Sequence, residues 1–322
     1  MKTDYLIIGS GCSGLYCALH LPENKKVTVI TKSDAESSDS YLAQGGMCVL
    51  KDESDYDSFF EDTMKAGHYE NDETSVALMI SSSQDVLEDL LSYGVNFQRK
   101  ENDELLYTKE GGHTGNRILF YEDLTGKEIT SKLLARAKER SNITILEHTT
   151  MVDIVSRDNE CLGAIIRKED GSLMACSAGV TVLATGGIGG LFNHSTNFSH
   201  LTGDAIAISV KHGVELRDID YVQIHPTTLY SKKPGRRFLI SESVRGEGGI
   251  LLNHKKERFT DELKPRDVVT KAIREEMKKE GTDFDYRTAK SVTIKGIPQR
   301  FMTKTGRVFC HLVTGRKNTY NH

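Results

Sequence analysis

Near the start of the chain, a short apolar run enters a cluster of glycines. The segment reads Gly9-Ser10-Gly11-Cys12-Ser13-Gly14 and is followed at once by LYCALHL, which has the composition of a helix. In such a pattern the first glycine permits a sharp turn, the second lets a phosphate approach the backbone, and the third lets the helix pack closely on the strand. The helix N-terminus then favours negative charge. The predicted chemistry is binding of a dinucleotide pyrophosphate.

The specificity of this motif for nucleotide binding depends on its surroundings, because a lone glycine pattern is common in ordinary turns. An apolar strand precedes it, and a second one, KVTVIT from Lys26 to Thr31, follows at the distance that a βαβ unit needs. An acidic residue that would bind a ribose hydroxyl is missing at the end of the second strand, where Lys32 and Ser33 stand and Asp34 comes just beyond. Nucleotide binding is therefore favoured, but an ordinary NAD site is not.

Alternating strands and helices must position this motif, and they predict an α/β fold. The apolar periodicity predicts helices over 57–66, 75–92, 127–140 and 203–211, and one that starts at Pro265. Predicted strands cover 143–147, 151–156, 162–167 and 180–184. The last of them enters a second glycine-rich loop at 184–190, and after 286 no regular element is predicted.

Composition excludes several classes of protein. The net charge is −4, yet 287–322 contains eight Lys or Arg and no Asp or Glu, so 1–286 carries 34 basic against 46 acidic residues, a net charge of −12. The basic residues of 287–322 are scattered, which favours a solvated segment over a nucleic-acid site. The six cysteines form no CxxC pair and no metal-ligand spacing, and no apolar run is long enough to span a membrane. We expect a cytoplasmic protein with reduced cysteines, no metal and no nucleic-acid or membrane partner.

Five further segments, taken together with the glycine motif, carry a resemblance. They read SSDSYLAQGG at 37–46, ATGGIGGLF at 184–192, QIHPT with SESVRGEGG between 223 and 249, and KPRD at 264–267. In this order they resemble the flavoprotein family of succinate dehydrogenase, fumarate reductase and L-aspartate oxidase, from about residue 3 to about 285. The resemblance implies a Rossmann-like FAD-binding domain at 1–218 and an incomplete α+β substrate-capping domain at 219–286.

The same resemblance implies FAD and assigns residues to it. The turn would bind the pyrophosphate, Lys32 would lie near the adenosine, and Asp204 would hydrogen-bond the flavin. The full set of cofactor residues that it implies is Gly9, Gly11, Cys12, Ser13, Gly14, Lys32, Ser40, Gln44, Gly45, Gly46 and Asp204. Members with covalently bound flavin carry a histidine where this chain has Asp39. That difference favours non-covalent FAD and the L-aspartate oxidase branch of the family.

On the substrate side, the resemblance implies a site for a four-carbon dicarboxylate, whose carboxylates suit guanidinium groups. It places His225, Ser241 and Arg245 around the substrate, with Glu110 as a contact to the amino group and His113 as a substrate or structural residue. Arg266 would be catalytic, as the proton donor that the family uses in fumarate reduction. L-aspartate would be oxidised to iminoaspartate with oxygen or fumarate as acceptor, the first step of quinolinate formation for NAD, with a possible functional link to quinolinate synthase.

Each assignment has a simpler alternative. His225 before a proline could be a structural loop histidine, the arginines could be surface ion-pair partners, and Glu242 could only brace Arg245. Two alternatives to an aspartate oxidase stay open for the whole chain: a soluble fumarate reductase flavoprotein, and an inactive FAD-binding remnant. The family continues beyond this chain, and 287–322 fits none of its motifs, so a reading-frame change near codon 286 and a genuine alternative ending are both possible interpretations.

Overall fold

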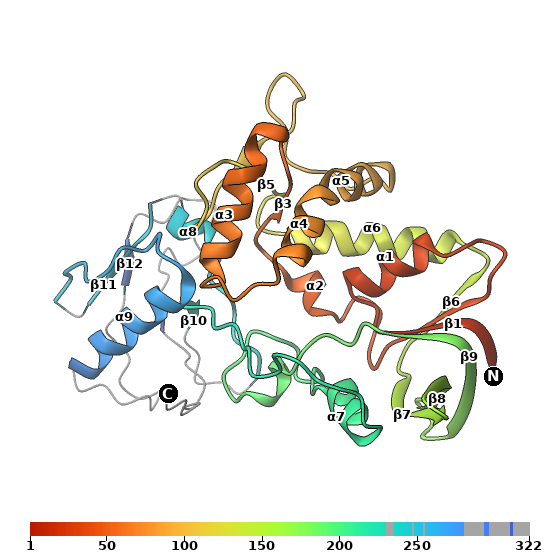
Figure 1. The fold of residues 1–322 in the computed structure, drawn as a ribbon. Coiled ribbons are helices and arrows are strands. Elements are labelled where there is room, and N and C mark those ends of the chain that lie inside the picture. The colour runs from red at the N-terminus through yellow and green to blue at the C-terminus, as the bar shows by residue number, and fades with distance from the viewer. Residues whose placement is uncertain (230–234, 247, 254, 280–292, 296–309, 312–322) are drawn as a thin grey trace.

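The computed structural model describes residues 1–229, 235–246, 248–253, 255–279, 293–295 and 310–311. Its main sheet has six strands in the order β6-β2-β1-β9-β8-β7, and it lies on the right in Figure 1. Four of these strands run parallel: β1 (Lys2–Ile8), β2 (Val27–Ile30), β6 (Ile143–Leu146) and β9 (Leu173–Leu183). Two more, β7 (Thr150–Arg157) and β8 (Glu160–Arg167), continue the sheet antiparallel. The predicted α/β class is confirmed.

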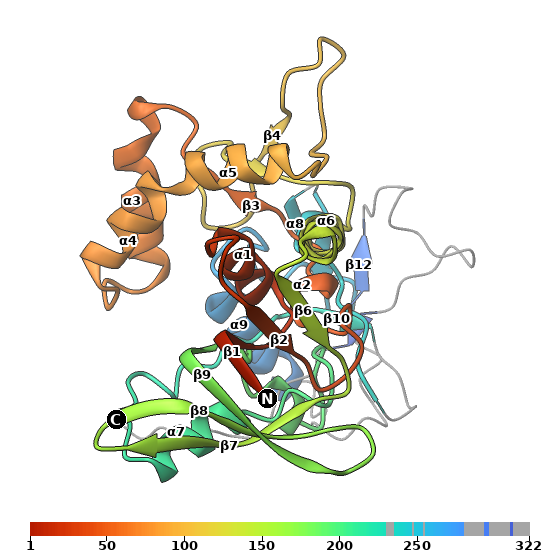
Figure 2. The same cartoon turned by 90° about the vertical axis from the view of Figure 1, so that its right-hand side faces the viewer.

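Both faces of the parallel part are covered, which explains why β1 and β2 read as continuous apolar runs. One face packs against α1 (Cys12–His20), α6 (Thr125–Glu139) and α5 (Ser83–Ser92) through one buried cluster. On the other face, Leu6, Ile8 and Ile30 join the β7–β8 hairpin and α7 (Asp204–Lys211) in a second cluster. Figure 2 shows α1 and α6 on one side of the strands, with α7 near β7 and β8 on the other.

The long helix predicted over 75–92 is wrong in one respect, because it is two helices. It divides into α4 (Glu73–Ser81) and α5 with Ser82 between them. The hydroxyls of Ser81, Ser82 and Ser83 donate hydrogen bonds to the carbonyls of residues three or four positions earlier. Consecutive serines that compete for helix carbonyls in this way favour a break, and apolar periodicity alone does not reveal it.

Smaller elements extend from this core. They are α2 (Asp39–Leu42), α3 (Tyr56–Ala66) and a three-stranded antiparallel sheet of β3 (Met47–Cys48), β5 (Ile118–Leu119) and β4 (Tyr107–Thr108). Two short 3-10 helices span Glu53–Asp55 and Gly189–Leu191. The region predicted as a capping domain contains β10 (Thr228–Leu229), α8 (Ser243–Gly246), β11 (Ile250–Leu252) and α9 (Arg266–Lys279). Helix α9 begins directly after Pro265, as predicted.

Two short strands come from the segment for which no regular element is predicted. Strand β12 (Thr293–Lys295) pairs antiparallel with β11, and β13 (Cys310–His311) pairs antiparallel with β10. The other residues of 287–322 lie outside the described residues, so the prediction of an atypical basic segment remains a prediction. Within the described part of the chain, no helix is long and apolar enough to cross a membrane.

Candidate functional site

The glycine turn between β1 and α1 is packed so closely that two of its glycines have no room for a side chain. Gly9 has a φ of +120°, and a Cβ placed on it would lie 2.1 Å from the carbonyl oxygen of Ala184. A Cβ on Gly14 would lie 2.1 Å from the carbonyl oxygen of Gly9. The positive φ of Gly9 fits the sharp turn expected at the first glycine, and the contact at Gly14 fits the close packing expected at the third. The second glycine-rich loop begins beside Gly9, at Ala184.

Gly11 differs, because its φ of −71° suits any residue and its surroundings are more open. A Cβ there would come within 3.0 Å only of the hydroxyl of Ser40. That hydroxyl accepts a hydrogen bond of 3.1 Å from the N–H of Cys12, the first residue of α1. Ser13 is exposed. The turn thus presents a helix N-terminus with a polar acceptor and no obstructing side chain, which fits a phosphate group.

The AQGG turn lies beside strand β5 and the loop that carries Glu110. Gly46 packs on β5, since a Cβ on it would lie 2.1 Å from Cγ2 of Ile118. A Cβ on Gly45 would lie 3.6 Å from a carboxylate oxygen of Glu110, so this carboxylate is above the turn. The side-chain oxygen of Gln44 is buried and has no hydrogen-bond partner among the described residues. A buried acceptor without a partner next to small residues fits a planar ligand that donates to it.

Lys32 and Asp204, predicted at the adenosine and at the flavin, are in contact. Nζ of Lys32 lies 2.5 Å from Oδ2 of Asp204 and donates to the carbonyl of His200 and to the hydroxyl of Thr202. Burial alone raises the pKa of Asp204, but Lys32 and Thr202 offset this and lower it below its usual value. Because the two side chains form one ion pair, a cofactor that contacts one of them also lies next to the other.

Asp39 stands at the position of the flavin-binding histidine in covalent members of the family. Its carboxylate accepts hydrogen bonds from the side-chain amide of Asn197 and from the N–H of Phe198, the latter at 3.0 Å. Burial raises the pKa of this carboxyl group. A carboxylate held in this way has no nucleophilic nitrogen with which to attach a flavin.

The predicted substrate arginines share one carboxylate. Oε2 of Glu242 accepts a 2.6 Å hydrogen bond from Nε of Arg266, and Oε1 lies 3.3 Å from NH2 of Arg245. Arg245 is only 2% exposed, and its Nε and NH2 have no hydrogen-bond acceptor within the described chain. Burial lowers the pKa of Arg245. Glu242 braces Arg245, as predicted, and it braces Arg266 as well.

His225 lies in the field of both arginines. Its Nδ1 is 2.9 Å from the carbonyl oxygen of Thr227 and 3.2 Å from the N–H of the same residue, and the shorter contact assigns the ring proton to Nδ1. Nε2 is then an acceptor, buried and without a partner among the described residues. Burial, together with Arg266 and Arg245, lowers the pKa of His225 to about 3. A neutral ring with an available acceptor can therefore meet a ligand here.

Ser241 and His113 are the two remaining predicted substrate residues. Ser241 is buried just before α8, and its carbonyl accepts a hydrogen bond from the N–H of Val244. His113 is in the loop that carries Glu110, where its Nδ1 is 3.3 Å from NH1 of Arg117 and its Nε2 is 3.7 Å from Sγ of Cys48. Burial, and then the charge of Arg117, lowers the pKa of His113. These contacts favour the structural interpretation of His113.

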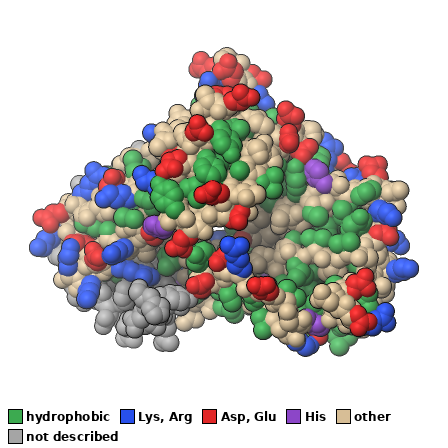
Figure 3. Space-filling model, viewed as in Figure 1, with side chains coloured by type: hydrophobic (Ala, Val, Ile, Leu, Met, Phe, Trp, Pro, Cys, Tyr) green, Lys and Arg blue, Asp and Glu red, His purple; other side chains and the backbone are tan. Residues whose placement is uncertain are grey.

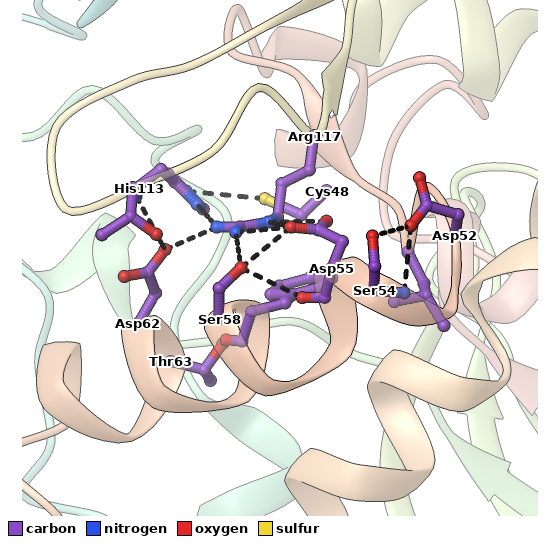
Figure 4. A network of polar contacts seen from close by, with 12 residues as sticks. Cys48, Asp52, Ser54, Asp55, Ser58, Asp62, Thr63, His113 and Arg117 are labelled. Carbon is purple, nitrogen blue, oxygen red and sulfur yellow. Dashed lines mark hydrogen bonds and ion pairs between the residues drawn. The ribbon is translucent and has the colours of Figure 1, made fainter.

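The sequence analysis missed the group to which His113 is attached. Arg117 is fully buried and donates to Asp55, Ser58 and Asp62. Figure 4 shows these side chains converging on the guanidinium from α3 and the preceding turn. We call Asp55, Ser58, Asp62, His113, Thr114 and Arg117 the Arg117 network. The available signal was an arginine at the end of a glycine-rich loop, with aspartates at helical spacing in 55–62.

Figure 3 shows that one face of the molecule is hollowed near its middle.

Comparison with known proteins assigns the chain to a family. A sequence model described as FAD binding domain matches residues 4–307, which extends beyond residue 285, the expected end of the resemblance. The chain belongs to the FAD binding domain family. Within this family, it is 50% identical over 277 residues to an L-aspartate oxidase of Clostridium perfringens and 44% identical over 302 residues to one of Clostridium acetobutylicum.

These matches cover 86% and 94% of the chain but 63% and 69% of the two relatives, so the chain spans roughly two thirds of their length. Solved structures agree with the fold of this FAD binding domain. A quinol fumarate reductase of E. coli matches with a TM-score of 0.82 and 26% identity, over 91% of this chain and 53% of that one. Mycobacterium smegmatis Sdh1 matches with a TM-score of 0.74 and 30% identity, over 86% of this chain and 50% of that one.

Proposed function

We propose that this chain is the FAD-binding and partial substrate-binding portion of an L-aspartate oxidase, with the domains dividing near residue 218. The observation that carries the proposal is the group of Arg245, Arg266, Glu242 and His225, in which two cations are close together and a buried imidazole nitrogen can accept a hydrogen bond. Guanidinium groups suit the two carboxylates of a four-carbon acid. Acceptors at His225 and at the carboxylate of Glu110 suit an ammonium group, which fumarate lacks.

The residues that would bind the cofactor fit FAD. Gly11 and the N–H groups at the start of α1 would receive the pyrophosphate, and Gln44 with Gly45 would line the flavin. When bound, FAD accepts a hydride equivalent, the hydrogen of the substrate carbon together with its electron pair. Asp39 supports non-covalent binding, because it replaces the histidine that tethers the flavin in other members.

The protein's own side chains would orient the substrate for this transfer. Arg245 and Arg266 would bind the carboxylates, and their charges would fix which face of the substrate carbon is presented. Glu110 would receive the ammonium group. This group would release one proton to water, and loss of the hydride from the carbon would then leave iminoaspartate as its protonated imine. Glu242 would keep both arginines in place, and in fumarate reduction Arg266 would donate the proton. Reoxidation by oxygen or fumarate would complete the cycle and supply iminoaspartate to the enzyme that makes quinolinate.

Two measurements on the purified chain test the proposal. The first compares the release of hydrogen peroxide with L-aspartate to the reduction of fumarate by a reduced dye. Fumarate reduction without aspartate oxidation would support a soluble fumarate reductase instead. The likeness of the fold to quinol fumarate reductase favours this second candidate. A yellow protein that performs neither reaction would be a flavin-binding remnant. Acid precipitation then tests the linkage, since non-covalent FAD stays in the supernatant and covalent flavin precipitates with the protein.

A further inference from the structure

A fully buried cation, Arg117, holds the end of the loop that carries Glu110. Arg117 uses all five of its N–H groups, since Nε donates to Asp55 at 3.0 Å, NH2 to Asp55 and Ser58, and NH1 to Asp62 and His113. Asp62 also accepts from the N–H and the hydroxyl of Thr114, at 2.7 and 2.9 Å. The network therefore joins α3 to the end of the loop.

The contact between Arg117 and His113 determines where the imidazole carries its proton. A guanidinium can only donate, so Nδ1 of His113 must accept the 3.3 Å hydrogen bond and carries no proton. The neutral ring then has its proton on Nε2, which lies 3.7 Å from Sγ of Cys48. Burial, and then Glu110, raises the pKa of Cys48 to about 11, so the thiol stays protonated and can accept from this N–H.

The same histidine is linked to Glu110 by a tight turn. The N–H of His113 donates to the carbonyl of Glu110 at 3.3 Å, and Gly111 between them is close to Glu242 and to the carbonyl of Leu263. Cys48 follows the AQGG turn by two residues, so the ring of His113 connects the loop to that turn. A displacement of the loop at His113 would therefore change the position of Glu110 relative to Gly45.

We propose that Arg117 is a positioning residue for the substrate site: it fixes His113 as the Nε2–H tautomer and orients the 109–114 loop so that Glu110 faces Gly45. For its effect on the substrate, the inference rests on the proposed function, in which Glu110 receives the ammonium group. Arg117 itself is buried between Asp55 and Asp62, so its role is to hold the loop and not to bind the ligand directly. Its effect is therefore selective for ligands that carry an amino group.

The first experiment does not depend on activity. Nitrogen-15 NMR of the histidine-labelled chain should show His113, assigned by loss of its signals in His113→Gln, with an unprotonated Nδ1 and a protonated Nε2 at pH 7. In Arg117→Lys, which offers one point charge in place of a planar fork, the signals should move toward a mixture of tautomers. A wild-type ring protonated on Nδ1, or an unchanged pattern in the variant, would overturn the inference.

The second experiment compares two ligands of the FAD-loaded chain, followed by the flavin absorbance. L-aspartate should bind about tenfold more weakly to Arg117→Lys than to the wild type, while succinate, which has no amino group, should change less than twofold. Thr114→Val, which removes only one donor to Asp62, gives a smaller change in the same direction and serves if Arg117→Lys does not fold. Asp153→Asn is the matched control, because that carboxylate pairs with Lys211 and His212 away from the loop.

The outcomes separate the two proposals. Equal weakening of both ligands in Arg117→Lys would show general damage and would overturn the positioning role. A wild-type chain that binds neither ligand would count against the proposed function, and the tautomer measurement would then decide the inference alone.

Discussion

Replacement of Gly11 by alanine should separate cofactor binding from folding. Gly11 has a φ of −71°, so alanine adopts its conformation without strain, and the new methyl would meet only the movable hydroxyl of Ser40 at 3.0 Å. The loss of a good N-cap and the lower entropy of the unfolded chain act in opposite directions, each by about 1 kcal/mol or less. We expect the free energy of unfolding without FAD to change by less than about 1 kcal/mol.

The same methyl would occupy the space through which a phosphate reaches the first N–H groups of α1. Loss of one hydrogen bond to a charged group costs about 1.5–3 kcal/mol, which weakens FAD binding roughly tenfold to 150-fold. At a FAD concentration 100 times the wild-type Kd, bound cofactor stabilises the wild type by about 2.7 kcal/mol. A variant weakened about 100-fold would gain only about 0.4 kcal/mol under the same conditions.

The assay is urea unfolding with and without FAD, together with a titration followed by quenching of flavin fluorescence. Gly14→Ala is the contrasting variant, because its methyl would lie 2.1 Å from a backbone carbonyl. It should lose about 3 kcal/mol of stability without any cofactor, at the upper end of what overpacking costs. Wild-type FAD affinity in Gly11→Ala, or a loss of stability as large as in Gly14→Ala, would refute the reasoning.

Three further outcomes follow from the substrate and cofactor groups. The pKa of His225 is about 3 in the folded protein and about 6.5 in the unfolded chain, so the folded state binds fewer protons between these pH values. The free energy of unfolding should therefore fall by up to about 1.4 kcal/mol per pH unit as the pH drops below 6.5. His225→Asn should remove this pH dependence in urea unfolding at pH 7, 6 and 5. Arg245→Met should leave the unfolding free energy within about 1 kcal/mol of the wild type, because it removes a costly buried cation while Glu242 keeps Arg266 as a partner. The variant should nevertheless lose succinate binding in a flavin titration, and retained binding would contradict the role of Arg245. Lys32→Met should cost less than about 1 kcal/mol in the same unfolding assay because its ion pair is partly exposed, and a larger loss would show that we underestimate the pair.

Local signals in the sequence predicted the strand–turn–helix unit of the expected cofactor site well. A turn with Gly9, Gly11 and Gly14 between an apolar strand and a helix requires only neighbouring residues, and the structure has it as expected. The Arg117 network could not be predicted in this way. Local residue types single out Arg117 and the aspartates, but Arg117 and Asp55 are 62 residues apart, and no local signal shows that they are in contact. Strand β12 was missed for a related reason, since its pairing partner β11 lies some 40 residues earlier.

The side-chain contacts of the predicted substrate residues could not be predicted from the sequence either. The motifs indicated Arg245 and Arg266 separately, but only the folded chain shows that one carboxylate, Glu242, contacts both. Likewise, the residue types could not tell whether His113 meets a ligand or a structural partner, because the answer depends on a buried arginine in the same loop. Sequence spacing predicts elements, whereas burial and long-range pairing decide what each charged side chain faces.

The hydroxyl of Ser40 has a consequence for how quickly a cofactor can bind. It already accepts a hydrogen bond from the N–H of Cys12, so this donor is satisfied and directed before any phosphate arrives. A phosphate oxygen that takes this donor needs only a rotation of the serine side chain, a motion of picoseconds to nanoseconds, and no rearrangement of the backbone. Loading at this end of the site would then be limited by encounter with the nucleotide and not by a slow opening of the protein.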